Sequence, residues 1–136
     1  WRPQASVSGG ALMSESAYTV ILADDMVPYR RLVRTVLEKS GSFRVVGEVG
    51  DGAEVIELTK AVKPDLVLLD LGMPEMDGLE VLSQISAASP ATKVVILSGF
   101  SEECMAARGL SLGAVRYLEK GIHPKALVQE LLAAMR

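Results

Sequence analysis

The fold can be worked out from one stretch of the sequence, Leu66-Val67-Leu68-Leu69-Asp70-Leu71-Gly72-Met73-Pro74. It begins with a short, wholly apolar run and stops at a carboxylate and a loop rich in turn formers. Such runs are typical of strands that are buried on both faces of a sheet. Similar runs occur at residues 20–25, 94–98 and 115–120, and each also ends in a polar group. The sequence therefore predicts four buried strands with polar side chains at their carboxyl ends.

Between these runs, the apolar residues change to helical spacing. The clearest case follows Pro28, which suits the first turn of a helix and is followed by apolar residues on one face. The expected strands are residues 18–23, 43–49, 66–69, 94–97 and 115–118. The expected helices follow them, and the last begins near Pro124. Strands alternating with helices predict a three-layer α/β/α domain with a five-stranded parallel sheet. The flavodoxin-like strand order 2-1-3-4-5 is the simplest choice, although alternation alone does not fix it.

The polar strand ends are expected to converge, because the carboxyl ends of parallel strands meet at one edge of the sheet. The groups concerned are Asp24, Asp25, Asp70, Ser98 and Lys120. Adjacent carboxylates repel each other, and Mg²⁺ favours oxygen ligands of this kind. An aspartate can also form an acyl-phosphate in covalent chemistry. Taken singly, each group could instead be a solvated turn, a loop cap or a surface lysine. Their joint placement favours a metal and phosphate pocket.

Length and composition are consistent with one packed domain. The chain has 136 residues, 49% of them hydrophobic, and a formal net charge of −3, which gives no sign of nucleic-acid binding. No apolar stretch approaches the roughly 18 residues that a membrane-spanning helix needs. The single Cys104 excludes an internal disulfide and fits a reducing, cytoplasmic compartment. The single His123 cannot anchor a histidine-rich metal site.

Residues 1–16 differ from the rest of the chain, because they are rich in turn formers and have no usable period. Met13 could be a native start, in which case the preceding residues are a remnant of cloning or an upstream extension. No charged segment followed by an apolar one indicates a secretory signal. We expect a flexible N-terminal segment at 1–16 and a single domain at 17–136.

The motifs resemble those of the receiver domain of bacterial two-component response regulators, over about residues 18–135. The resemblance rests on the acidic pair at 24–25, the stretch 68–78, Ser98-Gly99 and Tyr117-Leu118-Glu119-Lys120. The stretch 45–52 and the pair Lys120-Gly121 are most similar to the NarL/FixJ, or LuxR-type, branch.

This resemblance implies a flavodoxin-like (CheY-like) fold in which Asp70 accepts a phosphoryl group from a sensor histidine kinase. Asp25, Asp70 and the Gly72 carbonyl would hold Mg²⁺, with Asp24 contributing directly or through water. Ser98 and Lys120 would contact the phosphoryl oxygens, and Tyr117 would be the switch aromatic.

The surface around the fourth helix, fifth strand and fifth helix would then change, and the resemblance implies a homodimer that forms on phosphorylation. Members of this branch usually carry a helix-turn-helix output domain, through which DNA would be bound. The sequence stops at Arg136, so we expect either an isolated receiver fragment, which we favour, or a stand-alone receiver. No membrane contact is expected.

Two departures and two other hypotheses accompany the resemblance. Gly121 stands where many receivers have proline, and Phe100 is bulkier than the usual residue, so it could shield an acyl-phosphate or hinder access to it. An atypical receiver could act as a phosphorylation-independent dimerisation or interaction module. A haloacid-dehalogenase-type phosphatase needs a second aspartate two residues after its nucleophile, and the order Asp24-Asp25-Met26 does not supply it.

Overall fold

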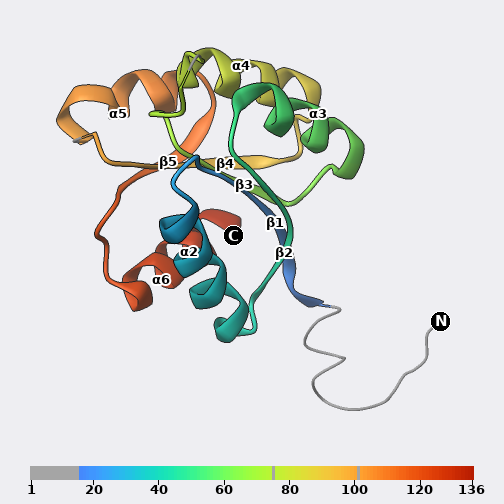
Figure 1. Cartoon of the computed structure of the whole chain (residues 1–136), viewed down its shortest axis with the longest axis vertical. Coiled ribbons are helices and arrows are strands. Elements are labelled where there is room, and N and C mark those ends of the chain that lie inside the picture. The colour runs from blue at the N-terminus through green and yellow to red at the C-terminus, as the bar shows by residue number, and fades with distance from the viewer. Residues whose placement is uncertain (1–15, 75, 101) are drawn as a thin grey trace.

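The computed structural model describes residues 16–74, 76–100 and 102–136, without the side chains of residues 102–105. Its centre is a five-stranded sheet of order β2-β1-β3-β4-β5, in which every neighbouring pair is parallel. Helices α2 and α6 cover one face, and α3, α4 and α5 cover the other (Figure 1). The predicted three-layer architecture and strand order are confirmed. The expectation for residues 1–15 lies outside the described residues.

The elements follow the predicted alternation closely. The strands are β1 (Tyr18–Ala23), β2 (Phe43–Val49), β3 (Leu66–Leu69), β4 (Lys93–Ser98) and β5 (Ala114–Glu119). The helices are α2 (Val27–Ser40), α3 (Gly52–Val62), α4 (Gly78–Ala88), α5 (Glu102–Ser111) and α6 (Pro124–Met135). No helix among the described residues is long and apolar enough to cross a membrane.

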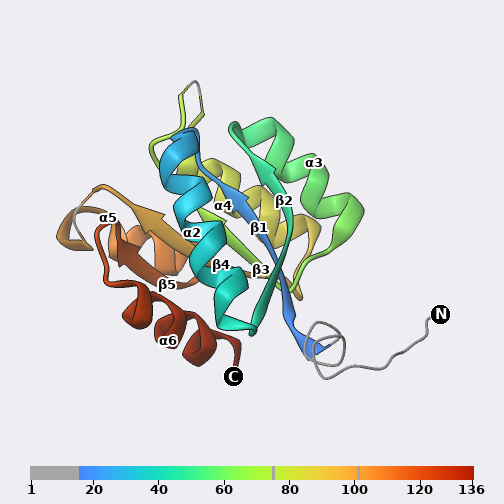
Figure 2. The same cartoon turned by 60° about the horizontal axis from the view of Figure 1, so that its bottom comes forward.

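The strands are continuous apolar runs because each face of the sheet has its own core. Alternate residues such as Ile21, Val67 and Ile96 point toward α3, α4 and α5. Their neighbours, Leu68 and Leu97 among them, point toward α2 and α6. All four residues of β3 are buried, so a polar residue on either side of this strand would be costly. Figure 2 shows α2 lying beside α6 on the second face.

Helix ends are fixed by capping groups that bring the loops to the carboxyl edge of the sheet. The side chain of Asp51 accepts a hydrogen bond from the Glu54 N–H (2.8 Å) at the start of α3. Asp77 accepts one from the Leu79 N–H (3.0 Å) at the start of α4. Side-chain caps of this kind satisfy backbone donors that have no partner within the helix.

The loop between β3 and α4 is held close to the helix that follows it. A Cβ atom at Gly78 would lie 2.7 Å from the Cα atom of Leu71, which is too near for any other residue. Gly78 therefore allows α4 to begin directly against the segment that follows Asp70. This close approach fixes where the β3 carboxylate stands relative to its neighbours.

Candidate functional site

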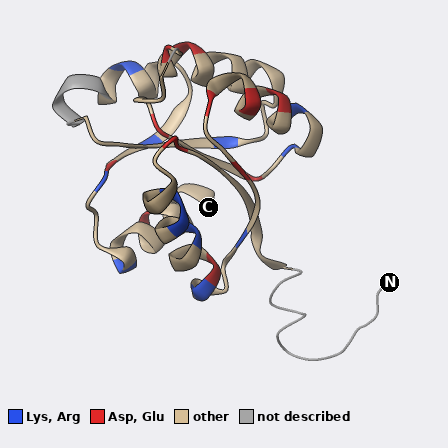
Figure 3. Cartoon of the chain, in the orientation of Figure 1, with Lys and Arg blue, Asp and Glu red and all other residues tan. Residues whose placement is uncertain are grey.

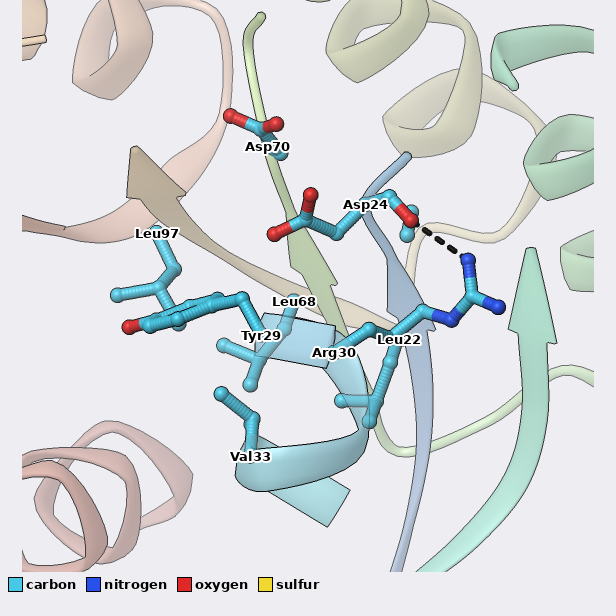
Figure 4. A pocket seen from close by; sticks show the side chains of 9 residues that line it. Leu22, Asp24, Tyr29, Arg30, Val33, Leu68, Asp70 and Leu97 are labelled. Atoms are coloured by element: carbon cyan, nitrogen blue, oxygen red, sulfur yellow. Dashed lines mark hydrogen bonds between the residues drawn. The ribbon is translucent and has the colours of Figure 1, made fainter. Parts of the chain in front are cut away.

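Three carboxylates converge at the carboxyl edge of the sheet, as the strand ends predicted. Asp24, Asp25 and Asp70 each place one oxygen within 4.8 Å of the other two. Asp24 and Asp70 are buried, and Asp25 is exposed. The Asp70 N–H donates to the Ala23 carbonyl (2.9 Å), so the sheet bonding continues past β3 and holds this carboxylate in place. Figure 4 shows the Asp24 and Asp70 side chains next to each other, at the ends of β1 and β3.

Within the described part of the chain, Lys120 is the only basic residue whose side chain contacts these carboxylates. Its Nζ atom lies 2.8 Å from Asp24 Oδ2 and 3.4 Å from Asp70 Oδ2. The Lys120 N–H donates to the Ser98 carbonyl (2.8 Å), which ties the residue after β5 to the end of β4. The side chain is 15% exposed, so the ion pairs are partly shielded from water.

The charges of the site act on one another strongly. Burial raises the pKa of Asp70, and the nearby Asp24 carboxylate adds to this rise, while the Gly72 N–H and Lys120 oppose it. Burial lowers the pKa of Lys120, but the bonds to Asp24 and Asp70 together outweigh burial and raise it. Three carboxylates face one ammonium group, so negative charge remains in excess. An all-oxygen donor set with excess negative charge suits a hard divalent cation.

Gly72, whose carbonyl was predicted to be a metal ligand, lies beside Asp70. Its N–H donates to Asp70 Oδ1 (3.1 Å). A Cβ atom at this position would stand 3.6 Å and 3.8 Å from the two Asp70 carboxylate oxygens, and 3.9 Å from Cε2 of Phe100. The absence of a side chain therefore leaves space next to the Asp70 carboxylate. The assignment of the Gly72 carbonyl to a metal stays a prediction.

Ser98 and Tyr117 meet at the backbone of Phe100. The Ser98 side chain is fully buried, and its Oγ atom accepts a hydrogen bond from the Phe100 N–H (3.1 Å). The buried Tyr117 donates its hydroxyl proton to the Phe100 carbonyl (2.9 Å). Phe100 itself is 52% exposed. The two residues predicted to act in a switch are thus joined through one exposed loop residue.

Arg30 is a site residue that the sequence analysis did not single out. Its Nη1 atom donates to the carbonyls of Asp24 (2.7 Å) and Val49 (3.4 Å), and its Nε atom donates to Glu48 (2.8 Å). Figure 4 shows the guanidinium reaching Asp24 from α2. Basic residues recur along α2, whereas acidic residues lie in α3 and at the start of α4 (Figure 3). The available signal was Glu48, a lone acid within the apolar β2 run, which needs a basic partner.

The ionisation of Glu48 should make the free energy of unfolding vary with pH in the acid range. The hydrogen bonds from Arg30 and Arg34 lower the pKa of Glu48 from its ordinary value of 4.5. A lowered folded-state pKa contributes stability that is present above about pH 4.5 and lost as the pH falls through the folded value. Glu48→Gln is expected to lower the free energy of unfolding by about 1–2 kcal/mol at pH 7. Urea unfolding between pH 7 and pH 3 should show this difference shrinking with acid.

The control for this experiment is Glu57→Gln. Glu57 pairs with Lys60 (3.4 Å), but its side chain is 76% exposed, so a small loss at every pH is expected. A Glu48→Gln difference that is the same at pH 7 and pH 3 would show that the effect is packing and not the charge of Glu48.

Comparison with known proteins places the chain in a family. Residues 20–132 match the family described as response regulator receiver domain. The chain is 40% identical over 124 residues to the uncharacterised transcriptional regulatory protein YxjL of Bacillus subtilis, covering 91% of this chain and 57% of that protein. It is 34% identical over 120 residues to the nitrate/nitrite response regulator NarL of Escherichia coli, covering 88% and 56%. The chain thus spans a little over half the length of these relatives.

A solved structure gives the same result. The signal receiver domain of the putative response regulator NarL from Mycobacterium tuberculosis superposes with a TM-score of 0.83 at 35% identity, covering 88% of this chain and 97% of that one. The chain therefore belongs to the family of response regulator receiver domains, which are signalling phosphoacceptor domains and not conventional enzymes. The relatives include NarL- and LuxR-type regulators, as the sequence motifs predicted.

Proposed function

We propose that this protein is a phosphorylation-activated receiver and that Asp70 is its phosphoacceptor. The supporting observation is the placement of the Asp70 carboxylate beside Asp24, Asp25 and the Lys120 ammonium. In the proposed reaction, an Asp70 oxygen forms a bond to phosphorus, and the bond from phosphorus to the donor nitrogen or oxygen breaks. The leaving group keeps the electron pair of that bond. Lys120 stabilises the negative charge of the transferred group.

Mg²⁺ fits the same site as a cofactor, because all three side chains offer hard oxygen ligands within reach of one ion. When bound, the ion would offset the repulsion between the carboxylates and the incoming phosphoryl group. Asp25, Asp70 and the Gly72 carbonyl would hold it, with Asp24 acting directly or through water. Asp25 suits the outer side of the site, because it is the exposed member of the three.

The proposed switch runs from Ser98 to the surface formed by α5, β5 and α6. Ser98 would turn its hydroxyl toward the phosphoryl group. It would then lose the hydrogen bond of 3.1 Å that it accepts from the Phe100 N–H in the structure. Since Tyr117 holds the Phe100 carbonyl, the loop and this ring would move together. Tyr117 also lines a surface hollow with Leu110 and Val115, so a shift of the ring would change that surface.

The proposed biological setting follows from the relatives. A sensor histidine kinase would supply the phosphoryl group in the cytoplasm, and a receiver domain at 17–136 would dimerise when modified. Its output would be transcriptional control through a helix-turn-helix domain that contacts DNA, with no DNA contact by the receiver itself. The supporting fact is that the chain matches transcriptional regulators that are nearly twice as long as the aligned region. A phosphorylation-independent interaction module is the alternative, and the next experiment separates the two.

The test is direct labelling of the protein. Incubation with acetyl phosphate and Mg²⁺ is expected to add the mass of one phosphoryl group, which intact-protein mass spectrometry would detect and mild base would remove. Omission of Mg²⁺ should strongly reduce the labelled fraction. A protein that stays unlabelled by acetyl phosphate and by a panel of histidine kinases would favour the phosphorylation-independent module.

Magnesium should also stabilise the fold, because it would bind the folded site and not the unfolded chain. At a Mg²⁺ concentration one hundred times the dissociation constant, the gain is about 2.7 kcal/mol. For a domain of this size, that raises the unfolding temperature by on the order of 10 °C. Thermal unfolding with and without Mg²⁺ measures it.

Asp25→Asn is expected to abolish this shift and to leave the metal-free protein at least as stable, since one repelling charge is removed. Glu57→Gln also removes one negative charge, at an exposed side chain of α3, and should keep the full shift. An undiminished shift in Asp25→Asn would place the ion elsewhere.

A further inference from the structure

Besides the aspartate carboxylates, an aromatic ring also lies against the ammonium group of Lys120. The Lys120 Nζ atom lies 4.9 Å from the centroid of the Tyr29 ring. This distance is within the range at which the ring face attracts an ammonium group. We infer that Tyr29 is the positioning residue of Lys120, and that its ring keeps the ammonium group in the pocket when the carboxylates bind a cation. The inference rests on the proposed phosphoacceptor function.

The need for such a residue follows from the charges. The Lys120 Nζ atom pairs with Asp24 at 2.8 Å and with Asp70 at 3.4 Å. A divalent cation among the same carboxylates would compete for their oxygens and would also repel the lysine. Its ion pairs would therefore weaken at the stage when Lys120 has to meet the incoming phosphoryl group. The attraction of a neutral ring is not lost to the metal, so it would hold the side chain at that stage.

The ring is itself well anchored. Tyr29 lies on the first turns of α2 and lines the pocket together with the core residues Val33, Leu68 and Leu97. Figure 4 shows the ring next to Leu97, at the base of the space beneath Asp24 and Asp70. A ring packed against core side chains cannot swing away at low cost. Its face is therefore available to the ammonium group in a fixed place.

Tyr29 also lies close to the residue after Lys120. Tyr29 and Gly121 line a common hollow with Ile122 and Pro124. Burial raises the pKa of Tyr29, and the nearby Gly121 backbone and Lys120 charge partly oppose that rise. Gly121 has a φ of +97°, which proline cannot adopt. Tyr29 thus lies beside the Lys120 ammonium group and lines a hollow with the residue that follows it.

The first test is spectroscopic and needs no phosphorylation. A nearby ring face moves the Lys120 ε-methylene proton resonance upfield in NMR spectra. Tyr29→Leu, which keeps apolar bulk and removes the ring, is expected to abolish this displacement both with and without Mg²⁺. Tyr29→Phe keeps the ring and should retain it. Tyr18→Leu removes a tyrosine at the opposite end of β1 and serves as the control. A Lys120 resonance that is unchanged in Tyr29→Leu would overturn the inference.

The second test is kinetic. At saturating Mg²⁺ and acetyl phosphate, Tyr29→Leu is expected to slow Asp70 labelling by about twofold to thirtyfold, the range that a cation–π contact supplies. The half-saturating acetyl phosphate concentration should stay the same, and Tyr29→Phe should restore most of the rate. In a Lys120→Ala background, Tyr29→Leu should cause no further loss.

The outcomes separate the two proposals. An equal loss with and without Lys120 would mean that Tyr29 acts through general packing, and the positioning role would be wrong. If the wild-type protein is never labelled, the phosphoacceptor function fails. In that case the NMR comparison still decides whether the ring holds Lys120.

Discussion

Asp70→Asn is expected to leave the protein folded and to abolish its labelling by acetyl phosphate and Mg²⁺. The amide cannot act as a carboxylate nucleophile, so the acyl-phosphate bond cannot form. The fold should survive, because the substitution removes a charge that Asp24 repels. Lys120 keeps its shorter contact, 2.8 Å, to Asp24. Intact mass and peptide mapping of the treated protein measure the result.

The matched control is Asp51→Asn. Asp51 is exposed, and its side chain caps α3 by accepting the Glu54 N–H (2.8 Å), a role that asparagine also fills. This variant should be labelled like the wild type. Full labelling of Asp70→Asn would contradict the assignment of Asp70. Weak labelling that maps to Asp24 or Asp25 would instead show a neighbouring carboxylate taking its place.

The fold and the meeting of the acidic groups were predictable from sequence, because both follow from a simple pattern. Strands buried on both faces appear as unbroken apolar runs, and β3 stands at residues 66–69 in both the prediction and the structure. The bounds of β1 and β2 also match the prediction, whereas β4 and β5 each extend one residue further at both ends. Once a parallel sheet is given, its carboxyl edge brings Asp24, Asp70 and Lys120 together without any detailed packing.

The contacts between α2 and the pocket were not predictable in this way. Arg30 and Tyr29 lie on a helix whose period shows only which residues face the core. A helical pattern does not show that a guanidinium reaches the Asp24 carbonyl or that a ring faces Lys120. These contacts depend on the distance and tilt between α2 and the ends of β1 and β5. The bonds of Phe100 to Ser98 and Tyr117 likewise depend on the path of an irregular loop.

Lys120→Ala and Ser98→Ala are expected to separate phosphorylation from its consequence. Lys120 supplies the positive charge that meets the transferred group, so Lys120→Ala should slow labelling of Asp70 on the order of 10²-fold. Lys125→Ala, an exposed lysine at the start of α6, is the control and should have no effect. Ser98→Ala leaves the three carboxylates and Lys120 in place, so labelling should continue. What Ser98→Ala removes is the hydroxyl that would join the phosphoryl group to the loop.

The response of the loop can be measured without acyl-phosphate turnover by using beryllofluoride, which mimics the phosphoryl group. In the wild type, beryllofluoride with Mg²⁺ is expected to change amide exchange at the end of β4 and along β5, because Ser98 releases the Phe100 N–H and Tyr117 holds the Phe100 carbonyl. In Ser98→Ala, that hydrogen bond is already absent, so the exchange change should be much smaller. An equal change in both proteins would make Ser98 a simple turn residue. The signal would then have to pass from Asp70 to β5 through Lys120, whose N–H bond to the Ser98 carbonyl (2.8 Å) joins the two strands independently of the hydroxyl.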